Sequence, residues 1–379
     1  MWKETTLTSL QARLTERAKP WRLRAVAVAA GTCLAAVGLA SPASATAATA
    51  NDTTTNRVCT KHRVSVDVRA LGPVTDVAGD IGEYEVYGEL CRPKGAQPKV
   101  AHVLVHGYSL DHSYWDSAYK PEKYSYVEAV TDAGYATFNI DRLGVGKSDM
   151  PPAPLANPLI QVDTVAQVVD KVRDGTVGGH AFEEVVIVGH SYGSWISKTV
   201  AAQHKNVDGV VVTGLLNRIQ YQRLAKFFPL SMIPAQMEDD TADAPAGYLV
   251  RRDGMARKLF FTPETPQPII DNAERHRPTA DPLVALIFEF EALPKDIDVP
   301  VLLVTGNKDH FLCSTAPVLQ ALYDCSSDEA MRSRSKPFLP NAPSVEAYAQ
   351  PGAGHNNAQD INASSFYQRT IDWTKQKIG

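Results

Sequence analysis

The chain has 379 residues, of which 44% are hydrophobic, and a chain of this length and composition can bury one large core. Its formal net charge is −4, and no stretch combines clustered basic residues with interleaved aromatic residues. This charge balance argues against nucleic acid as a partner and favours solubility.

The first 45 residues differ from the rest and are typical of a secretory signal peptide. Basic residues precede the apolar stretch Ala25 to Ala40, and the small residues Ala43-Ser44-Ala45 follow it. We expect cleavage near Ala45 and a secreted mature chain. The alternative is a membrane anchor, but a span needs about 20 apolar residues and this stretch is shorter and rich in alanine. We therefore expect no stable membrane anchor.

Four cysteines remain in the expected mature chain, namely Cys59, Cys91, Cys313 and Cys325. An even number in an exported chain predicts two disulfides, for which three connectivities are possible. We expect sequence neighbours to pair, Cys59 with Cys91 and Cys313 with Cys325. A metal site is the alternative, but the C-x-x-C spacing and the histidine pairs of such a site are missing, so no metal is expected.

The elements of the mature chain alternate between strands and helices. Residues 46–58 predict a flexible tail, and alternating apolar residues at 63–69 and 84–90 predict an antiparallel pair of strands. Apolar runs predict further strands at 100–105, 136–140, 185–188, 207–212, 299–305 and 344–349. Helical composition or spacing predicts helices at 125–133, 160–172, 194–204 and 363–377.

This alternation is typical of an α/β fold with a mostly parallel sheet and helices on both of its faces. It is interrupted at residues 214–295, where apolar clusters are separated by Pro, Gly and acidic residues. We interpret this segment as an inserted cap. The core is then formed by residues 59–213 and 296–379.

Ser191 lies in the sequence Gly189-His190-Ser191-Tyr192-Gly193, directly after the strand predicted at 185–188. This is a G-x-S-x-G pattern in the strand–turn–helix context that the pattern requires. A tight turn leaves no space for side chains at the two glycine positions. The turn presents the serine hydroxyl at the carboxyl end of the sheet and directs the amide of Tyr192 to the same point.

Three other strand ends carry residues suited to catalysis. His106-Gly107-Tyr108 follows the strand at 100–105, Asp309 follows the strand at 299–305, and His355 follows the strand at 344–349. In an α/β sheet, catalytic groups gather at the carboxyl ends of the strands.

In these motifs and their order, the chain resembles the α/β-hydrolase family over roughly residues 60 to 379. The resemblance implies a catalytic triad of Ser191, Asp309 and His355. It also implies that the backbone amide of Tyr108 joins that of Tyr192 in an oxyanion hole.

The chemistry of each residue type fits this arrangement. A serine hydroxyl is a weak nucleophile at neutral pH, so it needs a base within hydrogen-bond distance. His355 would accept the proton of Ser191, and Asp309 would fix the tautomer of the imidazole.

Other polar residues compete for these roles. His310 is an alternative base, His106 is expected to support the oxyanion loop, and His190 is interpreted chiefly as a packing residue. His190 is also a candidate for substrate contact, together with Gly107, Phe227 and Phe228.

Apolar clusters at 224–230 and 259–261 predict a hydrophobic roof over the site. We therefore expect a secreted carboxylesterase or lipase-like hydrolase that cleaves small esters with a hydrophobic group through an acyl-enzyme, without a cofactor. A peptidase or amidase, another acyl-transfer enzyme or a carbon–carbon bond hydrolase could use the same triad. A non-catalytic binding protein would be expected to have lost a triad residue.

Overall fold

The computed structural model describes residues 56–69, 80–217, 229–282, 296–314, 316 and 324–379. The predicted leader, most of the predicted tail, and both Phe227 and Phe228 lie outside the described residues.

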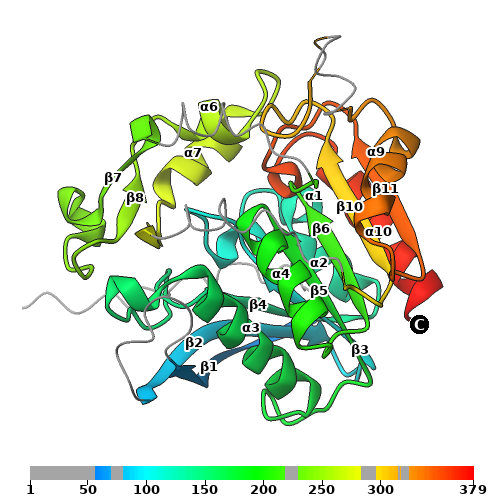
Figure 1. Ribbon diagram of the computed structural model, residues 1–379, viewed down its shortest axis with the longest axis horizontal. Helices are drawn as coiled ribbons and strands as arrows, with labels where there is room; N and C mark the ends of the chain where they lie inside the picture. Colours follow the sequence, from blue (N-terminus) through cyan, green and yellow to red (C-terminus); the bar gives the residue numbers. More distant parts are fainter. Residues whose placement is uncertain (1–55, 70–79, 218–228, 283–295, 315, 317–323) are drawn as a thin grey trace, which may run out of the picture. The chain divides into compact units, whose positions relative to one another are not determined.

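An eight-stranded sheet forms the core, in the order β1-β2-β4-β3-β5-β6-β10-β11 (Figure 1). Its strands are β1 (Arg57–Arg69), β2 (Asp80–Pro93), β3 (Val100–Val105), β4 (Ala136–Ile140), β5 (Glu184–His190), β6 (Gly209–Thr213), β10 (Val301–Gly306) and β11 (Val345–Gln350). The pairs β1–β2 and β2–β4 are antiparallel, and the other neighbouring strands are parallel. The predicted α/β fold, with its antiparallel beginning and mostly parallel sheet, is therefore confirmed.

Helices cover both faces of this sheet (Figure 1). The longest helices are α3 (Pro158–Arg173), α4 (Tyr192–Gln203) and α10 (Ala363–Lys377), and shorter helices are α1 (Pro121–Tyr124), α2 (Tyr126–Asp132) and α9 (Asp328–Ser335). Helix α3 packs against α4, α2 packs against α10, and α9 packs against β11. Every residue of β3, β4, β6 and β10 is buried, as expected for strands with helices on both sides.

Helix α3 illustrates how the sequence determines these elements. The side chain of Asn157 accepts hydrogen bonds from the amides of Leu159 (3.0 Å) and Ile160 (3.1 Å), which caps the first turn. Val165, Val168, Val169 and Val172 follow at helical spacing and are all buried. One face of the helix is therefore fixed against the sheet.

The first two strands form a longer hairpin than the alternating pattern predicts. Strand β1 begins at Arg57 and β2 continues to Pro93, and Cys59 is paired with Cys91 across the two strands. These two cysteines form a disulfide, and a second disulfide joins Cys313 to Cys325, 12 positions apart in the sequence.

A second, smaller sheet lies in the sequence between β6 and β10. It is antiparallel, in the order β7-β8-β9, and its strands are β7 (Met232–Pro234), β8 (Leu249–Arg251) and β9 (Thr279–Ala280); helices α6 (Ala256–Phe260) and α7 (Gln267–Arg275) join β8 to β9. Several hydrogen bonds attach this segment to the core, including two close to the small sheet. Tyr248 donates to the Pro151 carbonyl (2.9 Å), and Thr279 donates to the Gly144 carbonyl (2.8 Å).

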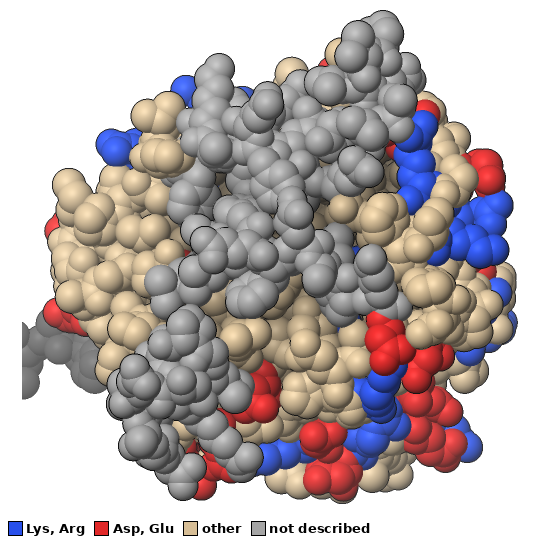
Figure 2. Space-filling view, in the orientation of Figure 1, with Lys and Arg blue, Asp and Glu red and all other residues tan. Residues whose placement is uncertain are grey.

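On the face in Figure 2, basic and acidic side chains are interspersed among the described residues. Within the described ranges, none of the helices is both long and apolar enough to cross a bilayer.

Candidate active site

Ser191 lies at the tip of the turn between β5 and α4, in a strained backbone conformation. Its φ is 51° and its ψ is −113°, a region that non-glycine residues rarely adopt. The Ser191 amide donates to the Thr213 carbonyl (2.8 Å), which ties the turn to the end of β6.

The two glycines that flank Ser191 have no room for a side chain. A Cβ on Gly189 would lie 2.4 Å from the Gly193 carbonyl oxygen, and a Cβ on Gly193 would lie 2.3 Å from the Val105 oxygen. The first approach packs the turn against the start of α4, and the second places it against the end of β3. The space argument made from the G-x-S-x-G pattern therefore holds at both positions.

Asp309 and His355 extend the site from two further strand ends. His355 Nε2 lies 2.9 Å from Ser191 Oγ, and His355 Nδ1 lies 2.7 Å from Asp309 Oδ2. The other oxygen of Asp309 accepts from the Phe311 amide (2.9 Å), so the carboxylate is held in one orientation. Asp309 is fully buried and His355 is 6% exposed. The structure thus joins the three predicted residues in one hydrogen-bonded chain.

Aromatic rings surround the imidazole of His355. Phe260 stacks on it at a centroid distance of 6.3 Å, and Phe311 meets it edge-on at 5.1 Å. Because Phe260 comes from α6, the segment between β6 and β10 contributes directly to this site. The carbonyl of Phe260 also accepts from the Asn356 amide (3.0 Å).

The other predicted histidines make different contacts, although the His190 ring lies 5.0 Å from that of His355. His190 is fully buried, and its ring nitrogens contact Thr213 Oγ1 (3.0 Å) and Asn356 Oδ1 (3.3 Å). Its ring also stacks on Tyr114, so its environment favours a packing role over substrate contact. His310 packs against Phe311, whereas His355 is the histidine whose Nε2 accepts the hydrogen bond from the Ser191 hydroxyl.

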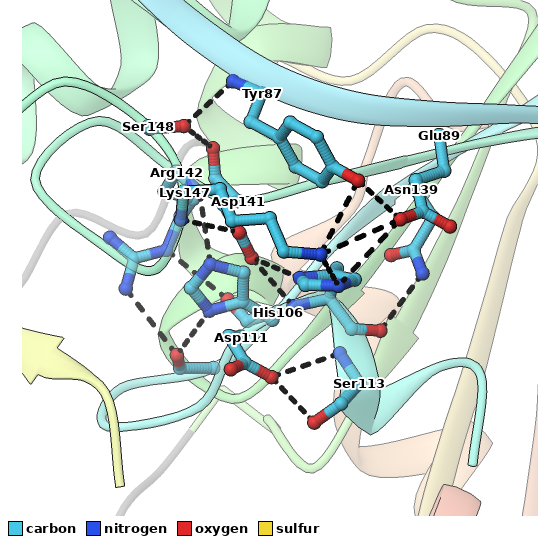
Figure 3. Close-up of polar contacts among 12 residues, drawn as sticks. Tyr87, Glu89, His106, Asp111, Ser113, Asn139, Asp141, Arg142, Lys147 and Ser148 are labelled. Carbon is cyan, nitrogen blue, oxygen red and sulfur yellow. Dashed lines mark hydrogen bonds and ion pairs between the residues drawn. The ribbon is translucent and has the colours of Figure 1, made fainter. Parts of the chain in front are cut away.

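The loop that follows β3 is held by polar contacts (Figure 3). His106 Nε2 accepts from the Arg142 amide (3.0 Å), so its Nδ1 is the protonated nitrogen and donates to the Gly107 carbonyl (2.9 Å). Burial, followed by the charge of Arg142, holds the pKa of His106 well below its usual range. Gly107 is buried against His190. His106 therefore supports the loop as a neutral ring.

Asp141 organises the glycine-rich loop after β4 (Figure 3). One carboxylate oxygen accepts from the amide of His112 (2.8 Å) and lies 2.7 Å from its Nδ1, and the other accepts from the Lys147 amide (2.8 Å). Burial lowers the pKa of His112, but the hydrogen bond and charge of Asp141 outweigh it and leave that pKa raised. These contacts agree with a structural role for the loop.

Sequence reasoning missed three buried charged residues near the site. Asp360 accepts from the Gly354 amide (2.8 Å) and the Ile361 amide (2.7 Å), and it thereby holds the loop that carries His355. Arg142 and Asp281 form an ion pair beside the loop that follows β3. No motif marks them, although charged residues inside apolar surroundings are a general sign of a functional site.

The described residues do not assemble a metal centre. Across the described ranges, no group of three or more His, Cys, Asp or Glu side chains could hold a metal ion. The chemistry that the arrangement offers is proton transfer between Ser191 and His355, with negative charge at Asp309.

The fold, and the positions of Ser191, Asp309 and His355 after β5, β10 and β11, match the arrangement found in α/β hydrolases. Residues 103–363 match the model of the Alpha/beta hydrolase family, and because this match covers more than half of the chain, the protein belongs to that family. No curated protein matches the chain.

Solved structures share this fold at low sequence identity. A thermophilic esterase from Thermogutta terrifontis with malate bound has a TM-score of 0.50 and 16% identity, and the match covers 84% of this chain and 100% of that one. The peroxisomal alpha-beta-hydrolase Lpx1 from Saccharomyces cerevisiae has a TM-score of 0.51 and 11% identity, with 84% and 89% covered. The complex of DcsB with its substrate analogue has a TM-score of 0.51 and 16% identity, with 84% and 99% covered. At these identities the likeness concerns the fold alone.

Proposed function

We propose that the protein is a serine hydrolase that cleaves carboxylic esters through an acyl-enzyme. The observation that carries this proposal is the hydrogen-bonded chain from Ser191 Oγ through His355 to Asp309. Ser191 Oγ attacks the ester carbonyl while His355 Nε2 accepts its proton, and Asp309 stabilises the resulting imidazolium. The alcohol leaves with the proton from His355. Water then attacks the acyl-enzyme by the same proton path and regenerates Ser191.

Two backbone amides serve as the oxyanion hole in this proposal. Tyr192 is the first residue of α4, where helix amides have no intrahelical partner. Tyr108 follows Gly107, whose backbone lies against His190, next to Ser191. Donors already in place when the oxyanion forms contribute about 3 kcal/mol each to transition-state stabilisation.

The substrate is proposed to be a small ester with a hydrophobic group. Phe260 and Phe311 flank His355, and both side chains are buried at the site. Such apolar walls favour a hydrophobic acyl or alcohol moiety. We assign residues 214–295 to a cap that contributes Phe260, and residues 59–213 and 296–379 to the catalytic core.

The mature protein is proposed to be secreted after removal of residues 1–45. The two disulfides support this assignment, because disulfides persist in oxidising compartments. Mass analysis of the protein from the culture medium tests it; a protein retained in the cytoplasm with an intact leader would refute it.

A panel of p-nitrophenyl esters from acetate to decanoate tests the activity, with p-nitroanilides of the same acids to detect amidase action. We expect turnover of the esters, with kcat/KM rising with acyl length, and loss of activity in Ser191→Ala. The matched control is Ser197→Ala, which removes another α4 serine whose hydroxyl donates to the Gly193 carbonyl (2.7 Å). Retained activity in Ser191→Ala would reject Ser191 as the nucleophile. Preferred cleavage of the anilides would instead identify an amidase.

A further inference from the structure

Arg142 is a fully buried arginine that holds the oxyanion loop by its carbonyls (Figure 3). Its Nε donates to the His106 carbonyl (3.3 Å), and its Nη2 donates to the Gly107 carbonyl (3.3 Å). The Gly107 carbonyl and the Tyr108 amide belong to one planar trans peptide group, so they point in opposite directions. Fixing the Gly107 oxygen therefore fixes the direction of the Tyr108 N–H.

The same guanidinium contacts the residue that supplies the other proposed donor. Its central carbon lies 4.7 Å from the centroid of the Tyr192 ring, a cation–π distance. The Tyr108 and Tyr192 rings also meet edge-to-face, with centroids 6.3 Å apart. One side chain thus touches the segments on both sides of the proposed oxyanion hole.

Asp281 connects this cluster to the segment between β6 and β10. Its carboxylate lies 3.5 Å from Arg142 Nη1, and its main-chain carbonyl accepts from the Tyr108 hydroxyl (2.8 Å). Asp281 is fully buried. Burial raises its pKa to about 6, while the charge of Arg142 acts in the opposite direction.

A buried ion pair is weak evidence for a stabilising role, because well-packed apolar side chains are often at least as stable. Here the guanidinium of Arg142 contacts the His106 and Gly107 carbonyls and the Tyr192 ring at the same time, which an apolar side chain could not do. This geometry favours a role in arranging the site.

We infer that Arg142 positions the Tyr108 and Tyr192 amides of the oxyanion hole, and that Asp281 holds Arg142 in that position. The inference rests on the proposed serine-hydrolase function and extends it to two residues outside the triad. It also makes the oxyanion hole dependent on the proposed cap. Displacement of the segment at Asp281 releases both Arg142 and the Tyr108 hydroxyl, and the site then loses its ability to stabilise the tetrahedral intermediate.

The test compares Arg142→Gln, Arg142→Lys and Asp281→Asn with wild type in p-nitrophenyl ester turnover. We expect kcat to fall about 100-fold in Arg142→Gln and about 10-fold in the other two variants, with KM changed less than about threefold. Lysine keeps the positive charge but lacks the planar guanidinium whose two nitrogens donate to the two carbonyls. Asparagine keeps the main-chain contact to Tyr108 but removes the negative charge that faces Arg142.

A control variant separates positioning from the general cost of altering a buried cation. Lys198 is also fully buried, and its Nζ donates to Asn217 Oδ1 (3.2 Å). Lys198→Gln should change the melting temperature with kcat within threefold of wild type.

A second readout is the affinity for an alkylboronic acid, whose adduct with Ser191 is tetrahedral. It should weaken in parallel with kcat across the Arg142 and Asp281 variants, whereas binding of the product alcohol should not change.

If Arg142→Gln folds and its kcat and boronate affinity stay within threefold of wild type, the inference about Arg142 is overturned while the proposed function stands. If that variant does not fold, the same outcome in Arg142→Lys and Asp281→Asn would overturn it. Wild type that neither turns over esters nor reacts with a fluorophosphonate at Ser191 would instead remove the proposed function, and the inference with it.

Discussion

Asp309→Asn is the change that tests the proton relay most directly. In the structure, Asp309 Oδ2 receives the hydrogen bond from His355 Nδ1 at 2.7 Å, while Oδ1 accepts from the Phe311 amide at 2.9 Å. An asparagine can keep its oxygen toward Phe311, and its NH₂ group then faces His355. The imidazole must turn its lone pair to that NH₂ group, which places the proton on Nε2. In that tautomer His355 cannot accept the proton of Ser191.

The expected loss in kcat is about 1,000- to 10,000-fold, equivalent to about 4 to 5 kcal/mol of activation free energy. It should be measured as initial rates of p-nitrophenyl butyrate hydrolysis at pH 8. KM should change little, because Asp309 is fully buried and does not touch the substrate.

The matched control is Asp360→Asn. Asp360 is equally buried and lies on the same loop as His355, but it bonds to backbone amides instead of the imidazole. We expect this control to lose stability while keeping kcat within about tenfold of wild type. A kcat for Asp309→Asn within tenfold of wild type would refute the assigned role of Asp309.

Three further predictions concern stability. Gly193→Ala should lower the free energy of unfolding by about 3 kcal/mol, because its Cβ would lie 2.3 Å from the Val105 oxygen; an unchanged denaturation midpoint would contradict this contact. Burial lowers the pKa of His102 to about 3, so below its unfolded pKa near 6.5 the unfolded chain binds a proton that the folded chain does not. Unfolding free energy should therefore fall by about 1.4 kcal/mol per pH unit from this residue as the pH drops from 6.5 toward 3, and urea titrations should show a shallower acid slope in His102→Gln. Cys325→Ala should cost about 3 kcal/mol by opening the disulfide loop to Cys313, and equal stability of reduced and oxidised wild type would argue against that contribution.

The proposed catalytic residues could be located from sequence because each follows a strand with a strong local signal. Val185 to Val188 form an unbroken β-branched run, and Gly189 and Gly193 are required by contacts that leave no room for a Cβ. Parallel strands bring their carboxyl ends to one edge of the sheet, so Asp309 and His355 could be expected near Ser191. Only the structure gives the distances of 2.7 Å between Asp309 Oδ2 and His355 Nδ1 and of 2.9 Å between His355 Nε2 and Ser191 Oγ.

The remaining features depend on tertiary contacts that local patterns do not reveal. The strands β7, β8 and β9 have only two or three residues each, too few for a periodic pattern to be recognised. Arg142 and Asp281 are polar residues at positions without any local requirement for burial, and their contact spans two separate parts of the chain. The charge of an isolated residue in a sequence does not indicate whether it is buried.

The positive φ of Ser191 makes folding and the proposed catalysis compete at a single position. Glycine would adopt this conformation with about 1 kcal/mol less strain, but it has no hydroxyl to offer. Replacing this serine by glycine would therefore relieve backbone strain and remove the proposed nucleophile in the same step.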